Sequence, residues 1–145
     1  MNTERLVVPF RRHHYEWLRE SNPTAEGSMF VPSDGVLAQL EAQNSWTGVV
    51  DGSPVVCAGT IRQWPGRHTA WAYLGKNTGP HMVWITKAVL ANLETMKGRL
   101  EFTVRSDFPI GQRWARMLGF KVENPRMEQY GPEKEDHVGY VRVNL

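Results

Sequence analysis

The chain has 145 residues, of which 41% are hydrophobic, which is enough for one domain with a packed core. Lysine and arginine exceed aspartate and glutamate by only 17 to 15, so the net charge provides no strong field to recruit nucleic acid or an anionic membrane. No apolar run approaches the ~18 residues of a membrane span, and the start of the chain lacks the pattern of a secretory signal. These features predict a single domain over residues 1–145, located in a reducing cytoplasm, with no nucleic-acid or membrane partner.

The first half of the chain predicts one strand, two helices and the start of a meander. The strand covers 5–10, and the helix at 13–21 is ended by Pro23 and Gly27. A second helix begins at Pro32-Ser33-Asp34 and directs Val36, Leu37 and Leu40 toward a core. Strands at 45–52 and 53–64 surround Asp51-Gly52, the strongest hairpin signal in the sequence.

The second half alternates strands with two helices. The predicted elements are a strand at 68–75 after the turn Pro65-Gly66, a helix from Pro80 to a stop at Gly98, a strand at 99–105, a helix at 109–118 capped by Gly119, and strands at 121–131 and 136–145 joined at Gly131-Pro132. The first helix directs Met82, Ile85, Val89 and Leu93 toward the core, and the second directs Ile110, Trp114, Met117 and Leu118. The predicted order is β-α-α-β-β-β-α-β-α-β-β.

This order resembles that of the GNAT superfamily, the Gcn5-related N-acetyltransferases, over essentially the whole chain. The sharper local match is VRSDFPIGQRWARMLGF (104–120), which resembles the family's last core strand and following helix, ending in Leu-Gly-Phe. The resemblance implies an α/β fold, with a central, mostly antiparallel twisted sheet flanked by about four helices. It also implies acetyl-CoA as cofactor and a V-shaped slot between the fourth and fifth strands, where the pantetheine pairs with backbone amides and an amide near Tyr73 or Leu74 polarises the thioester carbonyl.

The resemblance also locates the cofactor loop after the fourth strand, as Lys76-Asn77-Thr78-Gly79-Pro80-His81. In the family, amides of this loop bind the pyrophosphate, helped by the positive end of the helix dipole. Lys76 supplies a cation and Gly79 matches the family's glycine. Pro80 removes one amide, and His81 puts a bulky ring where the family has almost none. The alternative is that residues 77–80 only cap a helix.

Two polar positions of the family are apolar in this chain. The tyrosine that commonly protonates the departing thiolate, four residues before the glycine of Leu-Gly-Phe, is here Ala115, which transfers no proton. The asparagine eleven residues before that glycine is Phe108, whereas the small residue eight before it is kept as Gly111. We therefore expect Phe108, together with His81, to fill part of the cofactor groove and weaken acetyl-CoA binding. The catalytic residues stay unassigned.

Other residues that stand out in the sequence are expected to have structural roles. Cys57 is expected to be a buried, inert thiol, because no histidine lies near it in sequence. His13 and His14 are adjacent and so occupy different helical faces, and no metal site is predicted. Glu101 is expected to be a surface carboxylate, and Trp64 an exposed residue beside a hairpin tip.

Two functions of different classes remain open. The first is an acetyl-CoA-dependent N-acetyltransferase that acts on a protein or a small amine. The second is a non-catalytic interaction or virion protein that keeps the scaffold, because Ala115, Phe108, Pro80 and His81 depart from four functional positions of the family. The compact length, the altered loop and the terminal hairpin with Tyr-Gly-Pro are similar to small GNAT-like proteins of tailed bacteriophages. The partners would then be proteins of a phage particle, and the location a bacterial host cytoplasm or the virion.

Overall fold

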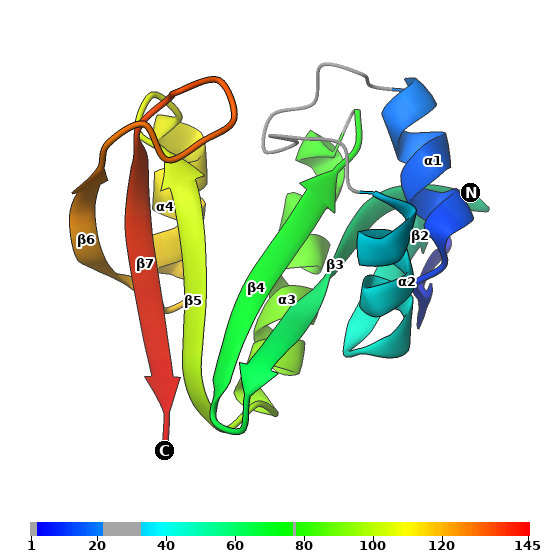
Figure 1. Ribbon diagram of the computed structural model, residues 1–145. Helices are drawn as coiled ribbons and strands as arrows, with labels where there is room; N and C mark the ends of the chain where they lie inside the picture. The colour runs from blue at the N-terminus through cyan, green and yellow to red at the C-terminus, as the bar shows by residue number, and fades with distance from the viewer. Residues whose placement is uncertain (1–2, 22–32, 77) are drawn as a thin grey trace.

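The computed structural model describes residues 3–21, 33–76 and 78–145, and it shows one seven-stranded sheet with helices on both faces (Figure 1). The strands are β1 (Arg5–Pro9), β2 (Ser45–Val50), β3 (Ser53–Trp64), β4 (Arg67–Leu74), β5 (Gly98–Arg105), β6 (Lys121–Met127) and β7 (His137–Asn144). The helices are α1 (Arg12–Ser21), α2 (Asp34–Ala42), the short 3₁₀ helix η1 (Gly79–His81), α3 (Met82–Glu94) and α4 (Pro109–Met117). The order of strands across the sheet is β1-β2-β3-β4-β5-β7-β6, and the predicted order of elements is confirmed.

Two apolar cores lie on opposite faces of the sheet. The larger core joins the sheet to α3 and α4, and the smaller one joins it to α1 and α2. Strand β4 contributes to both, because successive side chains of a strand point to opposite faces. Ala70, Ala72 and Leu74 pack toward α3 and α4, whereas Trp71 and Tyr73 pack toward α1 and α2. No helix among the described residues is both long and apolar enough to cross a bilayer.

The turn signals of the sequence are largely confirmed. Asp51 and Gly52 have φ values of 48° and 85°, which are the left-handed conformations of a two-residue hairpin, and Gly119 ends α4 with φ 85°. The predicted helix stop at Gly98 is wrong, because α3 already ends at Glu94 and Gly98 begins β5. Gly98 has a different role. Its φ is 98°, and a Cβ added there would lie 2.4 Å from the carbonyl oxygen of Gly66, so the β3–β4 turn requires a glycine at this position.

The buried face of α4 also differs from the prediction. Trp114 and Leu118 are buried as expected, but Ile110 and Met117 are 62% and 65% exposed. Gly111 and Ala115 are buried in their place. At 100° per residue, Gly111, Trp114, Ala115 and Leu118 span one face of a helix, and Ile110 and Met117 lie at its side. The sequence pattern predicts a buried face that includes the larger apolar side chains Ile110 and Met117, whereas the observed buried face is rotated toward Gly111 and Ala115.

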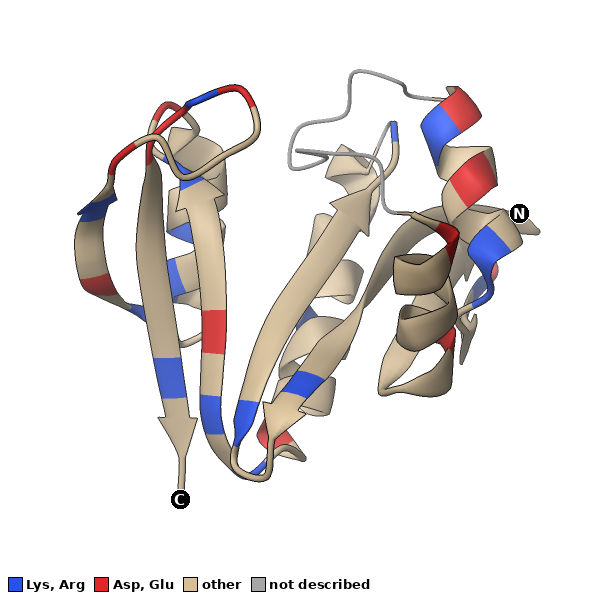
Figure 2. Cartoon of the chain, viewed as in Figure 1, with Lys and Arg blue, Asp and Glu red and all other residues tan. Residues whose placement is uncertain are grey.

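Strands β4 and β5 separate after a short parallel pairing, as the resemblance implied. Only Arg67↔Arg99, His68↔Leu100 and Thr69↔Glu101 are paired, and beyond them the strands diverge toward the end of β4 (Figure 1). We call the region between the diverging strands the slot. No lysine, arginine, aspartate or glutamate occurs in β4 after Arg67, so the slot side of β4 is uncharged (Figure 2).

Charged residues hold the paired end of these strands together. The guanidinium of Arg67 donates to both carboxylate oxygens of Glu101, with Nη2 to Oε2 at 2.8 Å, and Arg99 Nε donates to Oε1 at 2.9 Å. These hydrogen bonds, the one from Arg67 first, lower the pKa of Glu101 to about 2. Glu101 is therefore a bridging carboxylate between β4 and β5, which corrects the expectation of a simple surface group.

Candidate functional site

A cavity of about 470 Å³ opens between α3 and α4, beside the free end of β4. We call it the outer cavity. It is lined by Leu74, Met82, Val83, Thr86, Lys87, Phe108, Ile110, Gly111, Arg113, Trp114 and Met117. Its volume falls in the range of roughly 300–1,000 Å³ that is typical of small-molecule sites, and its wall is mainly apolar, as such sites require.

Exposed apolar side chains and two cations surround the outer cavity. Val83, Ile110 and Met117 are 72%, 62% and 65% exposed, which is unusual for three large apolar residues around one opening. Lys87 and Arg113 also line it, and no acidic side chain of the described residues lies within salt-bridge distance of either. The site therefore suits a ligand with an apolar part and a negatively charged part.

Phe108 lies in the wall of the outer cavity and packs over Gly111. A Cβ added to Gly111 would lie 2.6 Å from Cδ2 of Phe108 and 3.0 Å from Cγ1 of Val104. Gly111 thus makes room for the phenyl ring, and the small residue and the large one are complementary. The cavity remains open beside Phe108, so the ring narrows the site without filling it.

The loop before α3 offers fewer free amides than the family motif. The amide of His81 donates to the Thr78 carbonyl at 2.8 Å, and that of Gly75 donates to the Val55 carbonyl at 2.8 Å. Pro80 has no amide hydrogen. A Cβ added to Gly79 would meet nothing within 4 Å, so the backbone is open to close approach there, and Lys76 is exposed. Asn77, which was also expected to contact the cofactor, lies outside the described residues.

His81 does not line the outer cavity, contrary to the expectation that it helps to fill the groove. Its Nδ1 lies 3.4 Å from Nε and 3.3 Å from Nη2 of Arg5, which donate to it from β1. The side chain is therefore directed to the opposite side of α3 from α4. Arg5 and His81 are 76 residues apart, and no local pattern signals such a contact.

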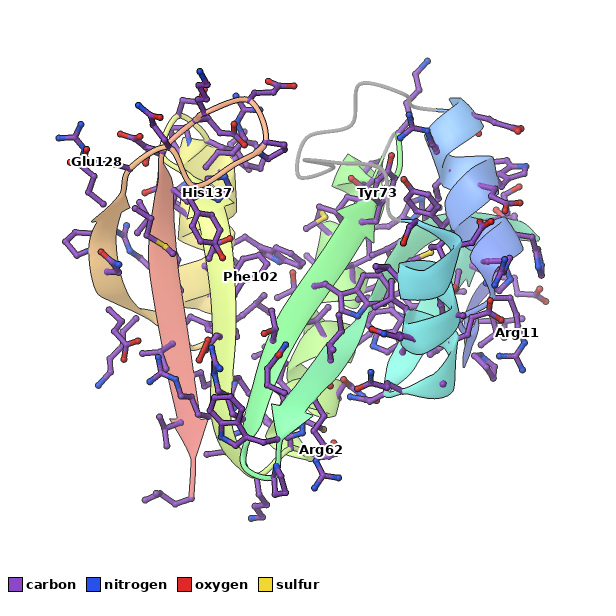
Figure 3. All side chains as sticks on the ribbon, in the orientation of Figure 1. Arg11, Arg62, Tyr73, Phe102, Glu128 and His137 are labelled. Atoms are coloured by element: carbon purple, nitrogen blue, oxygen red, sulfur yellow. The ribbon has the colours of Figure 1, made fainter. Side chains whose placement is uncertain are left out.

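Tyr73 and Phe102 lie on the two strands that border the slot (Figure 3). The ring of Tyr73 packs edge-on against Tyr15 of α1, with centroids 4.9 Å apart, and its hydroxyl is buried without a hydrogen-bond partner among the described residues. This hydroxyl faces the smaller core, whereas the next residue, Leu74, lines the outer cavity. Of the two strand residues expected at the cofactor, only Leu74 has its side chain in the outer cavity.

No carboxyl, imidazole, thiol or phenol group of the described residues lines the outer cavity. Ala115 is fully buried in the larger core, and the lining contains no aspartate, glutamate, histidine, cysteine or tyrosine. Cys57 is buried on the other face, where desolvation raises the pKa of its thiol to about 12. No three His, Cys, Asp or Glu side chains of the described residues are arranged to hold a metal ion.

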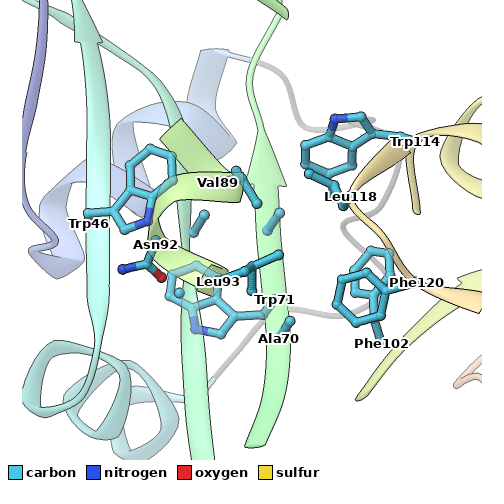
Figure 4. Close-up of a pocket in the computed structure, with 13 residues that line it drawn as sticks. Trp46, Ala70, Trp71, Val89, Asn92, Leu93, Phe102, Trp114, Leu118 and Phe120 are labelled. Atoms are coloured by element: carbon cyan, nitrogen blue, oxygen red, sulfur yellow. The ribbon is translucent and has the colours of Figure 1, made fainter. Parts of the chain in front are cut away.

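A second, smaller cavity of about 20 Å³ lies farther along β4, away from Leu74. Figure 4 shows the residues that line it. We call it the inner cavity. Small residues of β3 and β4 form its floor, and aromatic residues of β5 and the following segments close one side. It is lined by Trp46, Ala58, Gly59, Ala70, Trp71, Ala72, Val89, Asn92, Leu93, Phe102, Trp114, Leu118 and Phe120.

Four residues that line the site were not expected there from the sequence, namely Thr86, Lys87, Arg113 and Trp114. The spacing of residues on the two helices does indicate shared helical faces. Val83, Thr86 and Lys87 are three and four residues apart on α3, and Ile110, Arg113 and Met117 have the same spacing on α4. Each set combines exposed apolar residues with a cation on one helical face. The fact that the two faces oppose each other is a tertiary relation that neither helix reveals alone.

Comparison with solved structures relates this arrangement to known proteins, although no protein-family model matches the chain and no curated protein matches it in sequence. The structure of Ard1 from Thermoplasma volcanium aligns with a TM-score of 0.79 and 14% identity, over 97% of this chain and 98% of that one. A GNAT-family acetyltransferase from Bacillus anthracis aligns with a TM-score of 0.70 and 11% identity, over 99% and 97%. A structure of AAC(6')-Ib in complex with paromomycin and acetyl-CoA aligns with a TM-score of 0.65 and 15% identity, over 97% and 94%.

These alignments cover nearly the whole of each chain at identities too low to compare individual functional residues. They agree with the mixed seven-stranded sheet and flanking helices described above. The chain has the fold of the GNAT acetyltransferases.

Proposed function

We propose that this protein binds an acyl-CoA in the outer cavity and the slot, and transfers the acyl group to an amine of a protein or a small molecule. The observation that supports this most is the outer cavity itself, an open, mainly apolar volume of about 470 Å³ beside diverging strands. The fold is that of acetyltransferases, and one protein of this fold has been solved with acetyl-CoA. When bound, the cofactor would supply an acyl group activated as a thioester.

The residues present fit an acyl-CoA, with charged side chains in place of most loop amides. The apolar wall formed by Leu74, Met82 and Met117 suits the pantetheine arm. Lys87 and Arg113 line the same cavity and Lys76 is exposed in the loop before α3, so three cations are available for the phosphates. Since exposed charges are screened by salt, we expect the affinity for CoA to fall as ionic strength rises.

The chain contributes positioning more than proton transfer. The free edges of β4 and β5 provide backbone groups beside the slot, and these can orient the thioester as an added strand is oriented. The residues proposed to orient it are Tyr73 and Leu74, through their backbone. Because the described lining of the outer cavity has no tyrosine, histidine, cysteine or carboxylic acid to protonate the departing thiolate, and Lys87 is assigned to the phosphates, we expect slow turnover.

Isothermal titration calorimetry with CoA and acetyl-CoA tests this proposal. The wild-type protein should bind both saturably, and the double variant Lys87→Gln, Arg113→Gln should bind at least about tenfold more weakly, which corresponds to about 1.4 kcal/mol. Arg116→Gln is the matched control, since Arg116 is an exposed cation on the same helix that does not line the cavity. Equal affinity in the double variant and the control would contradict the assigned site.

Acyl transfer is measured separately, from thiol release in the presence of candidate amines. Saturable binding without turnover would leave the non-catalytic role, in which the fold serves as an interaction module, in a phage particle or in the bacterial cytoplasm. Failure to bind CoA at millimolar concentration would reject the acyl-CoA proposal as a whole.

A further inference from the structure

We propose that Trp114 sets the length of the acyl group that this protein accepts, by narrowing the way from the outer cavity into the inner cavity. This inference rests on the proposed acyl-CoA function and adds its substrate class. The inner cavity would receive the end of the acyl chain, and its size would restrict the protein to acyl groups of two or three carbons.

The two cavities are consecutive along the same three elements. On β4, Leu74 lines the outer cavity, and Ala72 and Ala70 line the inner one. On α3, Met82, Val83, Thr86 and Lys87 line the outer cavity, and Val89, Asn92 and Leu93 line the inner one. On α4, Ile110, Arg113 and Met117 belong to the outer cavity, and Leu118, which follows the helix, belongs to the inner one. The three elements therefore lead in one direction, from the surface toward the paired end of β4 and β5.

Trp114 lines both cavities and lies between them on α4. It is 8% exposed, and its indole nitrogen donates to Oγ1 of Thr86 at 2.9 Å, across from α4 to α3. A buried indole with its nitrogen paired has little freedom to change rotamer. The ring is thus a fixed constriction beside which the acyl chain would pass, and Thr86 is its positioning residue.

The inner cavity is apolar and small. Its walls include Ala70, Ala72 and Leu93, with the rings of Phe102 and Phe120 on the β5 side (Figure 4). A volume of about 20 Å³ holds one or two groups the size of a water molecule or a methyl. An acyl chain that entered it could therefore end in a methyl or an ethyl group, and a longer chain would meet Phe102 and Leu93.

Two variants change the inner cavity in opposite directions. Trp114→Leu removes the constriction and enlarges the inner cavity, whereas Ala70→Val adds methyl groups to that cavity at a strand position that favours a β-branched residue. Val143→Ala is the control, because Val143 is exposed on β7 and lines neither cavity. Ala70→Val makes the smaller change, so it tests the inference even if Trp114→Leu fails to fold.

The experiment measures dissociation constants for CoA, acetyl-CoA, propionyl-CoA and hexanoyl-CoA by calorimetry, each expressed relative to CoA for the same variant. We expect the wild-type protein and Val143→Ala to bind hexanoyl-CoA at least about tenfold more weakly than acetyl-CoA, since a pocket without space for extra methylene groups discriminates against them by this factor or more. Trp114→Leu should remove most of this difference, and Ala70→Val should weaken propionyl-CoA about tenfold relative to CoA.

The result that would overturn the inference is a wild-type protein that binds CoA but does not distinguish hexanoyl-CoA from acetyl-CoA. Unchanged ratios in Ala70→Val would overturn it equally. A protein that binds neither CoA nor any acyl-CoA would instead reject the proposed function, and the inference with it, so the CoA titration distinguishes the two failures.

Discussion

The packing of Phe108 on Gly111 predicts a strong coupling between these two residues. An alanine Cβ at position 111 would lie 2.6 and 2.8 Å from two carbons of the Phe108 ring, well inside van der Waals contact. Overpacking of this kind costs about 1–3 kcal/mol, whereas glycine to alanine inside a helix gains about 1 kcal/mol when space is free. We therefore expect Gly111→Ala to lower the free energy of unfolding by up to about 2 kcal/mol.

The same substitution should behave differently without the phenyl ring. In a Phe108→Ala background we expect Gly111→Ala to be neutral or stabilising, which gives an interaction energy of about 1–3 kcal/mol in the double-mutant cycle. Urea unfolding, followed by tryptophan fluorescence, measures all four corners of the cycle. Gly35→Ala in α2 is a control, because a Cβ there would meet only Oγ of Ser33 at 3.9 Å. An interaction energy below about 0.5 kcal/mol, as is found for independent sites, would show that Gly111 does not accommodate Phe108.

Three further predictions concern the paired end of the slot, the β3–β4 turn and the buried thiol. Because Arg67 and Arg99 lower the pKa of Glu101 from 4.5 to about 2, the carboxylate stabilises the fold above about pH 4.5, and this contribution is lost as pH falls toward 2. Its upper limit is about 3 kcal/mol, and with 22% of the side chain exposed we expect about 1–2 kcal/mol. Glu101→Gln should flatten the pH dependence of urea unfolding in this range, and Glu94→Gln, an exposed control, should not. Gly98→Ala should lower the thermal midpoint by several degrees, since it combines a positive φ with a 2.4 Å contact to the Gly66 carbonyl, and an unchanged midpoint would refute this role. Cys57 should react with a thiol reagent at pH 8 only after denaturation, because its pKa is about 12, and rapid labelling of the native protein would contradict its burial.

The arrangement of helices and strands could be predicted from local signals in the sequence. Asp51-Gly52 and Gly119 mark their turns through the left-handed backbone that they adopt, and β-branched runs mark the strands on either side. The divergence of β4 and β5 was expected only from the resemblance to a known family. No pattern within either strand indicates where their pairing ends.

The candidate site could be predicted only in part, because its shape depends on contacts between distant residues. The positions of Leu74 and Phe108 were expected, but the contact of His81 with Arg5 and the hydrogen bond from Trp114 to Thr86 join residues 76 and 28 positions apart. The exposed face of α4 was also predicted wrongly at Ile110 and Met117. Hydrophobicity alone predicts burial there, whereas the packing of the helix leaves both side chains beside a cavity.

The short pairing of β4 with β5 has a consequence for how the chain folds. Strands β1 to β4 are consecutive in sequence and pair as antiparallel neighbours, and so do β5, β7 and β6 as a second group. The residue pairs between β5 and β7 span α4 and β6 and lie 32 to 46 residues apart in sequence, and those between β4 and β5 span α3 and lie 32 residues apart. Closing segments of similar length has a similar entropic cost, but it gains eight residue pairs between β5 and β7 and only three between β4 and β5. We therefore expect each half of the sheet to assemble first, and the seam between them to form after the rate-limiting step. Substitutions at Thr69 would then speed unfolding and leave the rate of folding nearly unchanged.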